Sequence, residues 1–135
     1  MYKTILTPTE TGLLIPHWYD INPKKISRID RVCTRTSRFG FGPKANVMNV
    51  PAILIDDEGY ILNGRHRAYW ATKHGYSLET CVVSEPREVR FHVPSEVRGE
   101  LSVEEIIDSL DKKDTYIRAC NEQGIFSIND LVKKY

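Results

Sequence analysis

Residues 53–75, ILIDDEGYILNGRHRAYWATKHG, contain two apolar segments, an acidic link between them and a basic segment after them. The runs at 50–55 and 60–62 are rich in β-branched, aliphatic and aromatic residues, which favour strands. The link between them, residues 56–59, ends in Gly59, and glycine supplies the positive φ that hairpin turns need. The pattern therefore predicts a β-hairpin.

A helix is expected directly after the hairpin. Residues 65–74 contain no helix breaker, and Gly75 suits the left-handed conformation that ends many helices. Lys73 and His74 lie in the last turn, where cations complement the unpaired carbonyl groups. We expect the helix to run from Arg65 to His74, with Gly64 as the junction between strand and helix.

Basic residues open this helix, which is unusual because a cation at a helix N-terminus costs about 0.3–1 kcal/mol unless an anion is bound there. Gly64 is followed by Arg65, His66 and Arg67. The free N–H groups of a helix start also attract anions. We therefore predict that residues 64–67 hold a phosphate group. The alternatives are a carboxylate of the protein in the same place and a basic helix start that serves solubility alone.

The same residues carry a resemblance to a known family. Residues 61–71, followed by Lys73-His74-Gly75 and the strand-like residues 78–83, resemble the ParB N-terminal/sulfiredoxin superfamily, which includes ParB-like nuclease domains. In that family a strand ends in Asp or Asn, then come Gly-x-His-Arg or Gly-x-Arg-Arg, a helix, a glycine and another strand. Residues 21–26 resemble the segment after the family's first strand, so the resemblance covers roughly residues 13–85.

The resemblance implies a phosphate or nucleotide site at Asn63, Gly64, Arg65, His66 and Arg67. Family members bind and hydrolyse CTP, use ATP or phosphorylate free serine, and others are labelled nucleases. The candidate cofactors are therefore a nucleoside triphosphate, ATP or CTP, and Mg²⁺. The fold alone does not select among these activities.

Two departures from the family pattern narrow the expected functions. Sulfiredoxins have their catalytic cysteine between the Gly and the His, where this chain has Arg65, so we do not expect sulfinic acid repair. Partition proteins have a second arginine where His66 stands, and they continue into a helical DNA-binding domain with a dimerisation tail. Because this sequence ends at Tyr135, we do not expect a complete partition protein.

Two classes of function follow. The first is an enzyme that performs phosphoryl transfer or hydrolysis at the bound nucleotide, with His66 as the candidate general acid or base, although a phosphate hydrogen bond is the simpler role for it. The second is a ParB-like DNA-binding or nuclease module. The expected partners are a nucleotide and, in the second case, DNA.

A second basic region supports either class. Residues 24–44 contain a single acid, Asp30, against seven basic residues: Lys24, Lys25, Arg28, Arg31, Arg35, Arg38 and Lys44. Two phenylalanines in residues 39–43 stand among these cations, an arrangement that suits base stacking and phosphate neutralisation. We name Arg35, Arg38 and Lys44 as candidate contacts to phosphate or nucleic acid. The alternative is a solvated basic loop.

A helix from Ser27 through Arg35 would place Arg28, Arg31 and Arg35 on one face, because residues three and four apart are neighbours on a helix. These arginines could then converge on the anion held by Arg65 and Arg67.

Composition bounds the remaining possibilities. The chain has 135 residues, 41% of them hydrophobic, which suits one compact domain. Its three cysteines are far apart and form no Cys-x-x-Cys pair, so we expect reduced thiols and assign no metal ligand. Asp56, Asp57 and Glu58 could hold Mg²⁺ beside phosphates, or form a solvated turn. No apolar run approaches the roughly 18 residues of a membrane span, so we expect a soluble, cytoplasmic protein without a membrane partner.

The expected fold is α/β (α+β), a small mixed β-sheet with packed helices like that of ParB and sulfiredoxin. Besides the hairpin, we expect strands at 11–19, 78–84 and 88–93. Residues 1–94 would form this domain and residues 95–135 a helical extension packed on it. Ser102-Val-Glu-Glu105 is a capping box, and further helices are expected at 114–122 and from Ser127 or Asn129 to Tyr135. The last two helices have helix-turn-helix spacing, but we favour docking on the sheet because the final helix opens with an acid.

Overall fold

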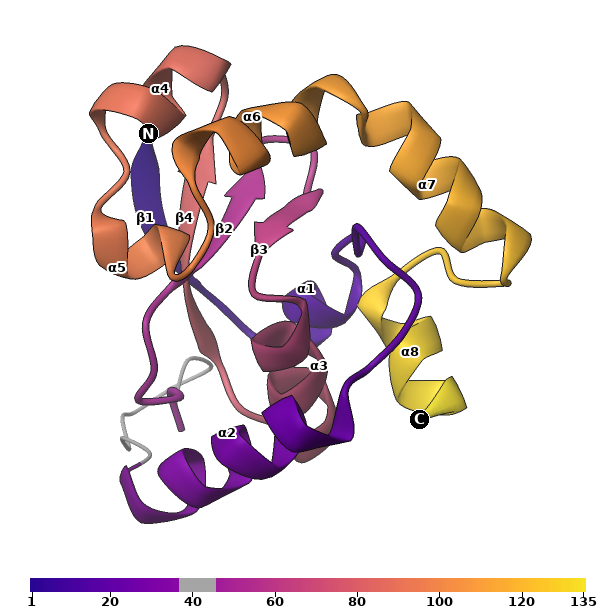
Figure 1. The fold of residues 1–135 in the computed structure, drawn as a ribbon. Helices are drawn as coiled ribbons and strands as arrows, with labels where there is room; N and C mark the ends of the chain where they lie inside the picture. The colour runs from indigo at the N-terminus through magenta and orange to yellow at the C-terminus, as the bar shows by residue number, and fades with distance from the viewer. Residues whose placement is uncertain (37–45) are drawn as a thin grey trace.

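A four-stranded sheet runs through the molecule, with helices on both of its faces (Figure 1). The computed structural model describes residues 1–36 and 46–135, residues 34–36 by their backbone alone. Within that part the strands are β1 (Tyr2–Leu6), β2 (Ile53–Asp56), β3 (Ile61–Asn63) and β4 (Leu78–Val83). The helices are α1 (Pro8–Gly12), α2 (Pro23–Thr36), α3 (Arg65–His74), α4 (Pro86–Phe91), α5 (Ser95–Arg98), α6 (Val103–Asp111), α7 (Lys113–Glu122) and α8 (Ile128–Lys134). The chain is therefore a mixed α/β protein, as expected.

The sheet is mixed, and its order is β1-β4-β2-β3. β2 and β3 form the predicted antiparallel hairpin, and β1 pairs antiparallel with β4. β4 pairs parallel with β2 on the side opposite to β3, so the chain must cross over β2 between β3 and β4. α3 makes this crossing, and its bounds are those predicted, with Gly75 in the left-handed conformation at its end.

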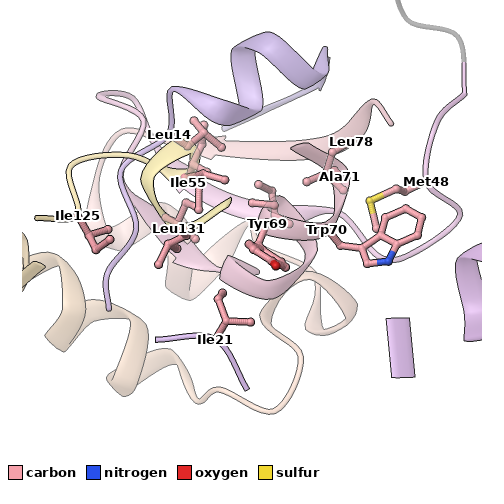
Figure 2. Close-up of a cluster of buried hydrophobic side chains, with 14 of the residues drawn as sticks. Leu14, Ile21, Met48, Ile55, Tyr69, Trp70, Ala71, Leu78, Ile125 and Leu131 are labelled. Atoms are coloured by element: carbon pink, nitrogen blue, oxygen red, sulfur yellow. The ribbon is translucent and has the colours of Figure 1, made fainter. Parts of the chain in front are cut away.

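Alternate residues of the strands face two separate hydrophobic clusters. Ile53 and Ile55 of β2 belong to a cluster with residues of α3 and α8, part of which is drawn in Figure 2. Leu54, between them in sequence, belongs to the second cluster, on the side of α4, α5 and α6. Each cluster contains residues from both sides of position 94, so the helices after that position pack on the same sheet.

The strand expected at 11–19 is not present. Residues 8–12 form α1, which begins with a capping box between Thr7 and Glu10 and has Pro8 in its first turn. Beyond it, only Ile15 pairs with the sheet, through an isolated bridge to Tyr60. The capping signal therefore places residues 11–12 in a helix, and residues 13–19 form a loop. β1, which is not among the expected strands, takes the edge position beside β4 instead.

The strand expected at 88–93 is also wrong, because residues 86–91 form α4. The alternation of Val89 and Phe91 does not correspond to one buried face, since Val89 is fully buried and Phe91 is 71% exposed. Pro86 lies in the first turn, and the Glu88 carboxylate accepts hydrogen bonds from the N–H groups of Ser84 and Glu85. These interactions satisfy the helix start and outweigh the alternating pattern.

The C-terminal helices agree with the prediction. Ser102 Oγ accepts a hydrogen bond from the N–H of Glu105 at 3.1 Å, which completes the expected capping box at the start of α6. α7 and α8 follow, and α8 contacts α3 rather than extending away from the sheet. None of the helices in residues 1–36 and 46–135 has the length and apolar character that crossing a bilayer requires.

Candidate functional site

The junction between β3 and α3 depends on Gly64. This residue has φ +114°, a conformation that side-chain-bearing residues rarely adopt, and a Cβ there would lie 2.3 Å from Cγ2 of Ile53. Helical hydrogen bonding begins with the Ala68 N–H, which donates to the Gly64 carbonyl at 2.9 Å. The N–H groups of residues 65–67 therefore have no partner within the helix, and Gly64 offers no side chain to cap them.

A cavity of about 330 Å³ opens at this helix start. Among the described residues, its charged lining consists of four cations from two helices and one acid from the loop after α5: Lys25, Arg28, Arg65, Arg67 and Glu100. Asn63, Gly64 and His66 also line it, so all five residues of the predicted motif reach the same cavity. The positive end of the α3 dipole adds to an already positive environment.

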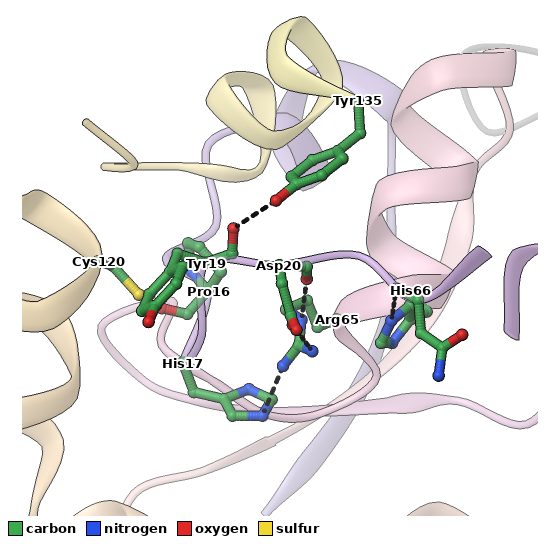
Figure 3. Close-up of polar contacts among 9 residues, drawn as sticks. Pro16, His17, Tyr19, Asp20, Arg65, His66, Cys120 and Tyr135 are labelled. Carbon is green, nitrogen blue, oxygen red and sulfur yellow. Dashed lines mark hydrogen bonds and ion pairs between the residues drawn. The ribbon is translucent and has the colours of Figure 1, made fainter. Parts of the chain in front are cut away.

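Arg65 is held by the loop at residues 16–20. Its Nη2 contacts Asp20 Oδ1 at 2.8 Å, and its Nε donates to the Asp20 carbonyl oxygen at 2.9 Å. Because a guanidinium can only donate, His17 Nε2 accepts from Nη1 at 3.2 Å (Figure 3). A carboxylate of the protein thus neutralises one of the two arginines, which is the alternative considered for the motif from its sequence.

Arg67 is half-buried and donates to the backbone of the two residues that precede β2. Its Nη1 donates to the carbonyl oxygens of Pro51 at 2.6 Å and of Ala52 at 3.2 Å. Burial lowers the pKa of Arg67 to about 10, so the group keeps its charge at neutral pH. With no carboxylate among these partners, its positive charge is left uncompensated beside the cavity.

His66 is neutral at physiological pH and has a defined tautomer. Burial, followed by the charges of Arg65 and Lys25, lowers the pKa of His66 to about 4. Its Nε2 accepts a hydrogen bond from the N–H of Asn22 at 3.0 Å, so the ring proton is on Nδ1 (Figure 3). In this arrangement Nδ1–H is a donor for an anion, while the lone pair that a general base needs is engaged. The catalytic role of His66 stays a prediction.

Asn63 ties two elements together. Its Nδ2 donates to the carbonyl oxygens of Val97 at 2.8 Å and Arg98 at 3.0 Å, the last residues of α5. These bonds hold the following loop, residues 99–101, against the cavity, where all three of its residues contribute to the lining. The side-chain amide donors of Asn63 are therefore committed to the protein itself.

The basic helix α2 contributes only part of what the sequence suggested. Lys25 and Arg28 line the cavity, whereas Arg31 is not among its lining residues. α2 begins at Pro23, four residues before the expected cap Ser27, which brings Lys25 into the helix. The candidate contacts Arg38 and Lys44 lie outside the described residues, and so does the side chain of Arg35.

The acidic turn of the hairpin does not fit a magnesium site for this cavity. Lys113 Nζ lies 2.6 Å from Asp56 Oδ2 and 2.9 Å from Glu58 Oε1, so an internal cation neutralises these carboxylates. Asp56 Oδ1 accepts from the N–H groups of Glu58 and Tyr60. The turn also lies at the opposite end of β3 from Gly64. These acids act as a structural turn, and Mg²⁺ would need other ligands.

Three groups of the site were not foreseen. His17 was only a position within the strand expected at 11–19, Lys25 was only one of the basic residues, and the loop 99–101 was not considered. His17 and the loop reach the cavity through contacts with Arg65 and Asn63 that span more than 30 residues of sequence. No local pattern signals such contacts.

Comparison of the chain with protein-family models, with curated proteins and with solved structures found no match. The ParB/sulfiredoxin resemblance therefore stays a prediction that depends on residues 61–83 and the segment before them. The proposed function below therefore depends on the geometry of the cavity and on this resemblance.

Proposed function

We propose that the cavity at the start of α3 binds the phosphate groups of a nucleotide, ATP or CTP. The observation that carries the proposal is the charge balance of the lining by described residues: with Arg65 neutralised by Asp20, three cations and a helix N-terminus whose first N–H groups have no partner in the helix face one carboxylate, Glu100. A helix start of this kind, preceded by glycine, is a favourable place for phosphate. The resemblance of residues 61–83 to the ParB/sulfiredoxin superfamily supports the same ligand and the corresponding fold.

The cations divide into two groups with different roles. Arg65 is neutralised by Asp20, whereas Arg67 donates to backbone carbonyl oxygens and provides a fixed positive charge. The N–H groups of residues 65–67 and Nδ1–H of His66 supply directed donors. Lys25 and Arg28, exposed on α2, close the cavity from the other side and are free to move onto the ligand. Charge-assisted hydrogen bonds to phosphate are stronger than neutral ones.

The proposal extends to phosphoryl transfer or hydrolysis. In such reactions the protein contributes mainly by positioning the nucleotide and stabilising charge on the transferred group, which this set of cations is suited to do. Mg²⁺ bound with the nucleotide would neutralise part of the phosphate charge. The base stays unassigned, because Nε2 of His66 is engaged by Asn22.

Isothermal titration with pyrophosphate, ATP and CTP, with and without Mg²⁺, tests binding. Lys25→Gln and Arg28→Gln should each weaken binding about five- to tenfold, corresponding to one exposed charge-assisted hydrogen bond. Arg31→Gln is the matched control, since it removes the same charge from the same helix without touching the cavity. Each variant should unfold at the wild-type temperature, because these side chains are exposed.

The absence of binding by all three ligands would refute the proposal. So would equal losses in Arg28→Gln and Arg31→Gln, because binding would then follow the general charge of α2. Titration with a short DNA duplex tests the alternative class, a DNA-binding module. In that class DNA binding should fall steeply with salt, and all the α2 variants should weaken it alike.

A further inference from the structure

A second cavity, of about 470 Å³, adjoins the first and has the opposite character. Trp18 and Tyr116 form aromatic walls, and Glu105 and Asp108 of α6 bring two carboxylates to it. It shares His17, Arg65 and Leu101 with the first cavity. Nothing in the proposed phosphate binding uses the aromatic and acidic residues of this second cavity.

The two aromatic walls meet at a corner. The rings of Trp18 and Tyr116 lie 6.3 Å apart with an interplanar angle of 83°. A flat ring stacks between parallel faces, whereas perpendicular faces enclose a compact, roughly spherical group. One face of Trp18 is already covered by Tyr19, whose ring stacks on it at 4.5 Å. The free aromatic surface therefore suits a small group better than a nucleobase.

The charges favour a cation in that corner. Glu105 and Asp108 stand three residues apart on α6, hence on one face of the helix. Glu105 Oε1 accepts from the N–H of Ser102 at 3.2 Å, and Asp108 Oδ1 pairs with the exposed Lys112 at 3.2 Å. Each carboxylate keeps its second oxygen, but Lys112 compensates the charge of Asp108, so the negative charge of this corner comes mainly from Glu105. Arg65 also lines this cavity, but Asp20 neutralises it at 2.8 Å.

We propose that this second cavity binds an organic ammonium group, with the aromatic rings supplying cation–π contacts and the carboxylates the opposite charge. Cations over the faces of Trp and Tyr are attracted by the ring quadrupole, and the attraction is stronger when water is excluded. The ammonium site does not depend on the phosphate proposal, because residues that only the second cavity contains carry it.

Choline is a suitable probe, and the two tryptophans of the chain report on its binding. In a ¹⁵N-correlation NMR titration with choline chloride, at ionic strength matched with sodium chloride, the Trp18 indole signal should shift and saturate. The Trp70 indole should stay in place, because its Nε1 donates to Asp30 inside the protein and Trp70 is 4% exposed. A spectrum of Trp18→Phe assigns the two signals.

Charge-removing variants on α6 test the carboxylates. Glu105→Gln keeps the capping box, since glutamine also serves at that position, and should weaken choline binding at least about threefold. Asp108→Asn should act in the same direction. Glu104→Gln is the matched control, because it removes the same charge from the neighbouring position, outside the cavity lining, and should leave binding unchanged.

Three results would overturn the proposal: no saturable shift of Trp18, an equal loss in Glu104→Gln, or a shift caused by neutral adenosine and not by choline. The first two exclude a specific ammonium site, and the third indicates a site for a flat ring. Pyrophosphate binding in the first cavity is measured separately, so failure of either proposal is recognised independently of the other.

Discussion

Replacement of Gly64 by alanine tests whether the strand-to-helix junction has the geometry described above. Gly64 has φ +114°, and the new Cβ would lie 2.3 Å from Cγ2 and 2.7 Å from Cβ of Ile53. Ile53 is fully buried in the central strand β2, so it has no room to retreat. We expect Gly64→Ala to be strongly destabilising.

Two costs add up to the expected magnitude. A side-chain-bearing residue at positive φ costs about 1–2 kcal/mol, and overpacking a closed core costs about 1–3 kcal/mol. The free energy of unfolding should therefore fall by about 2–5 kcal/mol, out of the roughly 5–15 kcal/mol typical of a domain.

Two other glycines separate these contributions. Gly75 and Gly124 have φ +77° and +76°, and a Cβ at either position would meet nothing within 4 Å. Gly75→Ala and Gly124→Ala should each cost only the backbone part, about 1 kcal/mol. Urea unfolding, followed by circular dichroism, gives the three free energies of unfolding under one set of conditions.

The comparison can contradict the reasoning directly. If Gly64→Ala lost no more stability than Gly75→Ala, within about 0.5 kcal/mol, the clash with Ile53 would not exist and the junction would be built differently. The slope of the unfolding free energy against urea concentration should be the same in all variants. An unchanged slope would show that each variant exposes the same surface area on unfolding.

Two further predictions concern internal charges. Lys113→Met should lower the free energy of unfolding by about 1–3 kcal/mol, because the 95%-buried Asp56 loses its cation; urea unfolding measures this, and Lys113→Arg should retain most of the stability. The pKa values of His17 and His66 are lowered to about 4, mainly by burial. As the pH falls below 6.5, these two histidines therefore bind protons in the unfolded chain before they do so in the folded chain. Stability should be full above pH 6.5 and fall between pH 6.5 and 4, and a urea midpoint unchanged from pH 7 to 4.5 would contradict this.

Local patterns in the sequence predicted the elements around the motif. The hairpin, the bounds of α3 and the capping box of α6 depend on residues within a few positions of one another, so their signals are complete in a short window. The strand predicted at 88–93 was wrong because its alternating pattern competed with a helix start, where the Glu88 carboxylate accepts from backbone N–H groups that a strand would have had to pair elsewhere. Of the strand predicted at 11–19, two residues belong to α1 and the rest form a loop with one bridge to the sheet.

The roles of the motif residues could not be predicted in the same way. The sequence placed two arginines and a histidine after Gly64, and only the tertiary structure determined their partners. Asp20 lies 45 residues from Arg65, and the two carbonyl oxygens bound by Arg67 precede it by 16 and 15 residues.

The sequence by itself determined that a basic helix start follows a glycine, because backbone conformation and the helix dipole are local properties. Which charges are neutralised and which face the cavity was decided by tertiary packing. The loop before α2, the loop 99–101 and β2 all pack around that helix start. Charge compensation depends on distance in space, and residues far apart in the chain become neighbours only when the core brings their elements together.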